Sequence, residues 1–110
     1  MATRASKALA GSEELLLADL IVAECVYVLE SFYEVPRERV AELIRAAIAL
    51  PTIKTLDPGT LLRALEVYEV DRLDFAEAYL VAQSEATGVG TILSFDKSID
   101  RVSTVTRREP

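Results

Sequence analysis

The stretch LDFAEAYLVAQSEATGVGTILSFD, residues 73–96, decides the fold because a helix signal in it leads directly into a strand signal. Asp74 is a candidate N-cap and Gly88 a candidate C-cap, so the apolar run between them predicts a helix. The residues TILSF, 91–95, then predict a buried strand, and Asp96 follows that strand directly. A helix followed closely by a short apolar strand is typical of α/β domains.

The rest of the chain repeats this alternation of strands and helices. Further β-like runs are predicted at residues 13–17, 52–56 and 103–107, and further helices at residues 19–29, 36–50 and 57–70. Such alternation favours a parallel sheet flanked by helices, with ligands bound beyond the carboxyl ends of the strands. The length of 110 residues fits one domain, so the sequence predicts a single α/β domain.

The composition narrows the chemistry that this chain can perform. A single cysteine, Cys25, cannot form an internal disulfide, and the absence of histidine excludes every histidine-based catalytic or zinc site. Any catalysis must therefore rest on carboxylates. The net charge of −6 argues against broad, charge-driven binding of nucleic acid. It is compatible with an acidic site that binds phosphate through metal ions.

The hydropathy pattern bears on location and assembly. Hydrophobic residues make up 51% of this short chain, which favours an apolar surface that contacts a partner or a second copy. The longest apolar run, residues 15–29, contains Asp19 and Glu24 and is shorter than the roughly 20 residues of a membrane-spanning helix. Residues 1–17 lack the apolar core of a signal peptide. We therefore expect no membrane association and a cytoplasmic location.

Several carboxylates fall where a site is expected. Asp96 ends the 91–95 strand, and Glu24 lies about one turn into the helix that follows the 13–17 strand. Asp74 and Glu77 open a helix at a spacing of three, which places them on one side of its first turn. Carboxylates brought together repel each other, and Mg²⁺ or Mn²⁺ relieves that repulsion by binding their oxygens. A metal so bound activates water and stabilises phosphoryl charge.

Each of these acids also has a structural interpretation. Asp74 and Glu77 fit a capping box, in which the first side chain binds the amide of the second residue and the second side chain reaches back. Asp96 fits a turn or cap before KSIDRV. Glu24 lies among apolar neighbours, where a charge is seldom buried without a partner. Cys25 fits a small buried hydrophobe. Both interpretations of each acid stay open on sequence grounds.

Taken together, three segments resemble the PIN-domain proteins, and specifically the VapC-type toxins of bacterial toxin–antitoxin pairs. The segments are LLLADLIVAECVYVLESFYEVPRERV at residues 15–40, DRLDFAEAYLVAQSEATGVGTILSFDKSIDRV at residues 71–102, and STVTRREP at residues 103–110. The resemblance implies an endoribonuclease that depends on Mg²⁺ or Mn²⁺. It also implies an RNA substrate and a cognate antitoxin protein as partners.

The resemblance assigns roles residue by residue. Glu24 in AECVYVL matches the family's second-helix acid, and Glu77 in FAEAYL stands where most members have Asp in an F-A-D-A run. Asp96 in SFD matches the late acid, and Asp100 in SIDR a possible auxiliary. The resemblance thus implies Glu24, Glu77 and Asp96 as catalytic residues, and the same three with Asp100 as metal ligands. Asp74 matches a commonly acidic position but is expected to cap the helix.

The front of the chain departs from the family pattern. Family members begin with a central strand carrying V-D-T-N, which supplies the first metal-binding Asp. No such motif occurs in MATRASKALAGSEELLL, and residues 3–17 resemble the helix before the family's second strand. We therefore expect residues 1–110 to form a PIN-like domain that is truncated at its N-terminus and lacks the central strand.

The missing strand carries expectations for function and assembly. Its two neighbours would expose unpaired backbone groups, which favours pairing with another copy. We expect a homodimer or larger assembly, with weak metal binding and impaired activity. The alternative is a catalytically inactive PIN-like module that serves in dimerisation or in antitoxin binding.

Overall fold

The computed structural model describes residues 13–110. The chain divides into two compact units, Met1–Pro58 and Gly59–Pro110, and each combines helices with a pair of short strands. The predicted α/β class, with helices and parallel strands, is confirmed. Residues 3–17, which resemble in sequence the helix before the family's second strand, lie mostly outside the described residues.

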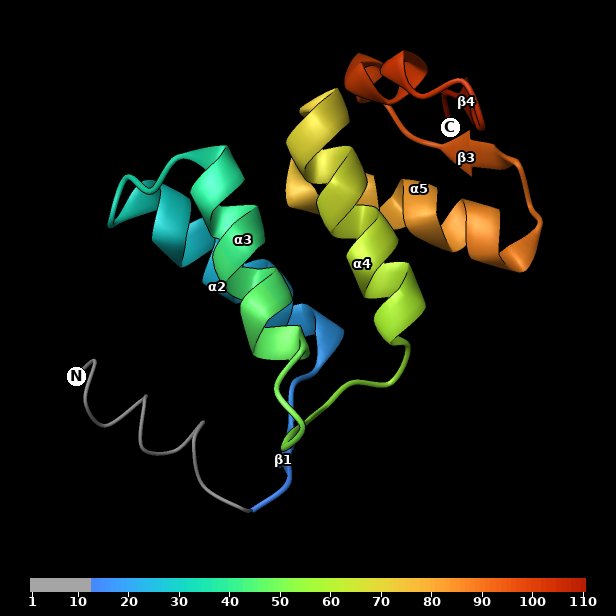
Figure 1. Cartoon of the computed structure of the whole chain (residues 1–110). Coiled ribbons are helices and arrows are strands. Elements are labelled where there is room, and N and C mark those ends of the chain that lie inside the picture. The colour runs from blue at the N-terminus through green and yellow to red at the C-terminus, as the bar shows by residue number, and fades with distance from the viewer. Residues whose placement is uncertain (1–12) are drawn as a thin grey trace. The chain divides into compact units, whose positions relative to one another are not determined.

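The first unit has two helices and one parallel strand pair. Its elements are β1 (Leu15–Leu16), α2 (Asp19–Ser31), α3 (Arg37–Ile48) and β2 (Ile53–Lys54). The pair β1–β2 is held by backbone bonds of 2.8 Å from the Leu15 amide to the Thr52 carbonyl and from the Leu17 amide to the Lys54 carbonyl. Figure 1 shows α2 and α3 side by side, and their facing apolar residues form the core of this unit. That core includes Val22, Val26, Val40, Ala41 and Ile44.

The ends of these helices follow local sequence signals. Pro36 occupies the N-cap position of α3, and Pro51 follows soon after its end, because proline suits a helix start but cannot continue a helix interior. Asp19 does not occupy the N-cap position of α2. Ala18 is the N-cap residue of α2 and Asp19 is the first residue of the helix. At that position the negative carboxylate interacts favourably with the positive end of the helix dipole.

The second unit contains the stretch from which the fold was predicted. Its elements are α4 (Pro58–Glu66), the π-helical turn η1 (Val67–Asp71), α5 (Phe75–Thr87), β3 (Thr91–Leu93), the 3-10 helix η2 (Lys97–Arg101) and β4 (Thr106–Arg108). The strands β3 and β4 are parallel, with Ile92 opposite Arg107. Gly88 ends α5 with a left-handed φ of 76°, so the C-cap prediction is confirmed.

An aromatic cluster fixes the start of α5. Tyr68 is fully buried, and its ring meets that of Phe75 edge to face with centroids 6.2 Å apart. Phe75 in turn stacks on Tyr79 at 6.2 Å, and Leu73 is fully buried just before the helix. Burial of large apolar side chains is the main stabilising contribution to a small core. The first turn of α5, which carries Glu77, is thereby held in place.

The strands form two separate parallel pairs. Within residues 13–110, β1 is paired with β2 and β3 with β4, and no strand joins one pair to the other. The strands predicted at residues 13–17, 52–56, 91–95 and 103–107 therefore exist but are shorter than the sequence suggested. In the same part of the chain, no helix combines the length and the apolar character needed to cross a membrane.

Candidate carboxylate site

Glu77 and Asp96 are the predicted site residues that the second unit brings near each other. Glu77 lies in the first turn of α5 and is half-buried, while Asp96 follows β3 and opens η2. The pKa of the Glu77 carboxyl is raised, first by burial and then by the negative charges of Asp96 and Asp74. The negative charges of Asp96 and Asp74 therefore both act on the Glu77 carboxyl.

Asp74 contributes charge without making the cap bond that was expected of it. It occupies the N-cap position of α5, but its side chain makes no capping hydrogen bond. The capping-box interpretation of Asp74 and Glu77 is therefore wrong in its side-chain bonds, although the helix begins where it predicted. The Asp74 carboxylate instead adds to the negative potential at Glu77.

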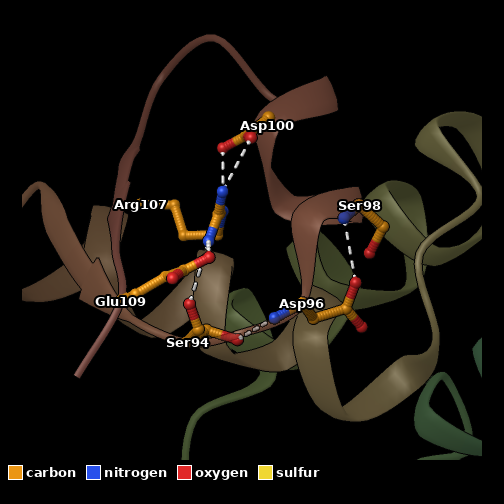
Figure 2. Close-up of polar contacts among 6 residues, drawn as sticks. All are labelled: Ser94, Asp96, Ser98, Asp100, Arg107 and Glu109. Carbon is orange, nitrogen blue, oxygen red and sulfur yellow. Dashed lines mark hydrogen bonds and ion pairs between the residues drawn. The ribbon is translucent and has the colours of Figure 1, made fainter.

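Asp96 is fixed at both its backbone and its side chain (Figure 2). Its amide donates to Ser94 Oγ at 3.0 Å, and its Oδ1 accepts from the Ser98 amide at 2.9 Å. Hydrogen bonds from Ser98, first from its side chain and then from its amide, lower the pKa of the Asp96 carboxyl, with Arg101 and Arg107 adding positive charge nearby. The turn-and-cap interpretation of Asp96 is confirmed, and the carboxylate is held ionised in a defined orientation.

The pKa values of Glu77 and Asp96 are shifted in opposite directions. That of Glu77 is raised by burial and neighbouring acids, and that of Asp96 is lowered by the Ser98 bond. Pairs of titratable groups that are driven apart in this way are typical of sites that handle protons. Folding therefore favours the ionised form of Asp96 and the protonated form of Glu77.

Asp100, expected as an auxiliary metal ligand, is engaged by an arginine. Arg107 Nε lies 3.2 Å from Asp100 Oδ1 and Arg107 NH2 lies 3.3 Å from Asp100 Oδ2. The same guanidinium contacts the Ser94 carbonyl and Glu109 Oε1, each at 3.2 Å. Figure 2 shows Arg107 between the two acids and the Ser94 turn. Both oxygens of Asp100 are thus committed to Arg107.

Glu24 belongs to the first unit. It is exposed near the middle of α2, so its expected meeting with Glu77 and Asp96 stays a prediction. The neighbouring Cys25 is partly buried, and burial followed by the charge of Glu24 raises the pKa of its thiol. A thiol with a raised pKa is a poor nucleophile at neutral pH, so Cys25 offers no alternative chemistry.

A pocket in the second unit lies apart from these acids. It has a volume of about 440 Å³ and is formed by the later part of α5 together with the residues of β3 and those just before it. Its lining contains no acidic or basic side chain. The carboxylates therefore lie outside this pocket, on the surface formed by the start of α5 and the end of β3.

The donor atoms suit a hard divalent cation, but the ligand set is incomplete in the described residues. Carboxylate oxygens are the ligands that Mg²⁺ and Mn²⁺ prefer. Among residues 13–110, however, no three acidic or cysteine side chains gather closely enough to hold a metal ion. Glu77 and Asp96 are thus the two predicted ligands that the structure places within each other's electrostatic influence.

Some residues around the site were missed or misjudged by the sequence interpretation. Ser94 and Ser98 hold Asp96, and a local signal existed, because an acid two residues before a serine is typical of a side-chain-capped turn. No local pattern in the sequence predicts the contacts of Arg107. Its side chain is only 13% exposed and joins two acids and a carbonyl, a role that only the pairing of β3 with β4 creates.

The sequence matches the PIN domain family over residues 1–105, and the chain belongs to that family. No curated protein matches it. The PIN domain is a nuclease-type fold, its members generally depend on divalent metal ions, and membership suggests that the chain binds RNA. Acids at the end of a strand and at the start of a helix agree with this class of protein.

Proposed function

We propose that this chain is a metal-dependent ribonuclease of the VapC toxin type, which acts in the cytoplasm and is inhibited by a cognate antitoxin protein. The observation that carries the proposal is the pair of Glu77 and Asp96, which approach one another from a helix start and a strand end with oppositely shifted pKa values. Membership of the PIN family supports hydrolysis of RNA as the reaction.

In this proposal Glu24, Glu77 and Asp96 hold Mg²⁺ or Mn²⁺ by their carboxylate oxygens. When bound, the ion supplies an activated water and stabilises negative charge on the RNA phosphodiester. Asp96 contributes a fixed, ionised carboxylate, because the Ser98 amide both orients it and favours its charged form. Glu77 contributes a carboxyl that takes up a proton at higher pH than an exposed glutamate does.

We further propose that residues 1–110 make up one PIN-like domain that lacks the family's first strand, and that its activity is impaired. The absence of a V-D-T-N motif from residues 1–17 supports this. That strand would also bring the first metal-binding Asp. A version extended by a V-D-T-N-type strand is expected to bind Mn²⁺ more tightly than this chain.

A second candidate function is that of an inactive module for dimerisation or antitoxin binding. One observation favours it, namely the exposed aromatic side chains at the end of α2 and just beyond it. Tyr27, Phe32 and Tyr33 are 63%, 73% and 65% exposed, and the rings of Tyr27 and Phe32 meet edge to face at 6.4 Å. Exposed apolar groups gathered in this way are typical of protein-binding surfaces. They also support a homodimer of the active form.

Cleavage of single-stranded RNA by the purified chain separates the two candidates. For a ribonuclease we expect slow cleavage that requires Mn²⁺ and is lost in Glu77→Gln and in Asp96→Asn. Asp71→Asn is the matched control, because it removes an acid of the same unit that lies at the end of η1. Stable folding and partner binding without any cleavage in Mn²⁺ would favour the inactive module.

A further inference from the structure

We propose that Arg107 is a positioning residue for Asp96, and that Asp100 acts through Arg107 and not as a metal ligand. The inference rests on the proposed function in so far as Asp96 binds metal. It assigns a different task to an acid that the family resemblance marked as an auxiliary ligand. The contacts in Figure 2 carry it.

A short chain of hydrogen bonds leads from Arg107 to the Asp96 carboxylate. Arg107 NH1 donates to the Ser94 carbonyl at 3.2 Å, and Ser94 Oγ accepts from the Asp96 amide at 3.0 Å. The Ser98 amide then donates to Asp96 Oδ1 at 2.9 Å. Arg107 thus holds the residue whose hydroxyl holds Asp96, at the point where the chain leaves β3.

The Ser94 turn is also held by the strand pair. The Ser94 amide donates to the Arg108 carbonyl at 3.0 Å, which continues the pairing of β3 with β4. Arg107 and Ser94 are therefore linked both through the backbone of β4 and through the guanidinium. A side chain on β4 is in this way coupled to the direction of the turn that follows β3.

The side chains of Asp100 and Arg107 differ in how much of their surface is exposed. The Arg107 side chain is 13% exposed, whereas the side chains of Asp100 and Glu109 are 57% and 54% exposed. A partly buried guanidinium is stabilised by acceptors for its charge, and Asp100 offers both carboxylate oxygens to it. To bind a metal ion, Asp100 would have to share its carboxylate oxygens with the Arg107 cation. Its observed contacts therefore favour an anchoring role.

In this arrangement the contacts of Arg107 fix the geometry of Asp96. Metal-binding groups must be held close to their productive geometry by the residues around them. Lysine at position 107 would keep the positive charge but lose the planar fork that reaches Asp100 and the Ser94 carbonyl together. Arg107→Lys is thus a sharper test than removal of the charge.

The experiment is a double-mutant cycle of Arg107→Lys and Asp100→Asn in the full chain, with Glu109→Gln as the control. The first readout is the backbone amide NMR signals of Asp96 and Ser98 in the metal-free protein. We expect Arg107→Lys to shift both signals and Asp100→Asn to shift them in the same direction by less. Glu109→Gln is expected to leave them nearly in place, because Glu109 contacts Arg107 through a single oxygen.

The second readout is the affinity for Mn²⁺, measured by titration. Arg107→Lys is expected to weaken it by about 10-fold to 100-fold, as is typical when an orienting neighbour of a metal ligand is changed. The double variant should bind no more weakly than Arg107→Lys alone, because Asp100 acts through Arg107. The proposal would be overturned if the two substitutions weakened Mn²⁺ affinity by factors that multiply in the double variant, while Asp100→Asn left the metal-free amide signals in place. Asp100 would then be a metal ligand.

The two readouts separate this inference from the proposed function. A parent chain that binds no Mn²⁺ would count against the metal site, yet the metal-free amide signals would still decide whether Arg107 positions Asp96. Unmoved Asp96 and Ser98 signals in Arg107→Lys, in a protein that remains folded, would overturn the positioning role whatever the metal affinity is.

Discussion

The guanidinium of Arg63 and the carboxylate of Glu85 face each other fork to fork. Arg63 Nε donates to Glu85 Oε1 at 2.7 Å, and Arg63 NH2 donates to Glu85 Oε2 at 2.9 Å. Thr104 Oγ1 also donates to Glu85 Oε2, at 2.5 Å. This cluster joins α4, α5 and the loop before β4 within the second unit.

Loss of this fork should destabilise the chain. Glu85→Gln is expected to lower the free energy of unfolding by about 1 to 2 kcal/mol, since charge-assisted bidentate bonds in partly buried positions exceed ordinary surface pairs. Urea unfolding at neutral pH measures the change. Glu66→Gln is the matched control, because Glu66 contacts the same arginine but its side chain is 57% exposed. An equal loss of unfolding free energy in the two variants would show that the bidentate pair with Glu85 stabilises the chain no more than the exposed pair with Glu66.

The same pair predicts a stability change in acid. Arg63 is the main cause that lowers the pKa of the Glu85 carboxyl below its ordinary value of 4.5. The ionised form is therefore favoured by folding, and this contribution is complete above pH 4.5 and lost as the pH falls through the lowered pKa. The difference in unfolding free energy between the parent chain and Glu85→Gln should shrink on acidification. A difference that is unchanged at about pH 3 would contradict this linkage.

Glu77 should behave in the opposite way. Its pKa is raised above the ordinary value of 4.5, mainly by burial, so the charged form is disfavoured by folding at neutral pH. Glu77→Gln is therefore expected to raise the urea midpoint at pH 7, and the gain should vanish as the pH falls below 4.5. Glu14→Gln, an exposed position, should show no such gain. A Glu77→Gln variant that is less stable than the parent at neutral pH would refute this account of its environment.

The exposed aromatic groups after the middle of α2 predict self-association. Sedimentation of the parent chain is expected to show a dimer or larger assembly, and Phe32→Ser with Tyr33→Ser should shift it toward monomer. Leu56→Ser is the control, because Leu56 is 90% exposed but lies outside α2. A parent chain that is monomeric at every concentration tested would remove the support for a homodimer.

The sequence predicted those parts of the fold that depend on local signals. The proline at position 36 and Gly88 mark helix ends because their backbone preferences act within one turn, and α3 and α5 accordingly begin and end near the expected residues. The alternation of helices and strands gave the α/β class for the same reason. Strand length was overestimated, since pairing requires a partner strand that no local pattern reveals.

The candidate site was predictable only in part. Asp96 and Glu77 follow from their positions after a strand and at a helix start, and the structure brings them within each other's electrostatic influence. The contacts that hold the site could not be predicted, because Arg63 and Glu85 are separated by 22 residues and Arg107 and Asp100 by 7. These pairs depend on tertiary packing.

The central claim is that Glu77 and Asp96 bind a divalent metal ion together, and titration of the chain with Mn²⁺ tests it most directly. We predict weak but saturable binding by the parent chain and by Asp71→Asn, and its loss in Glu77→Gln and in Asp96→Asn. The same Mn²⁺ affinity in all four proteins would contradict the claim, because the ion would then be bound elsewhere.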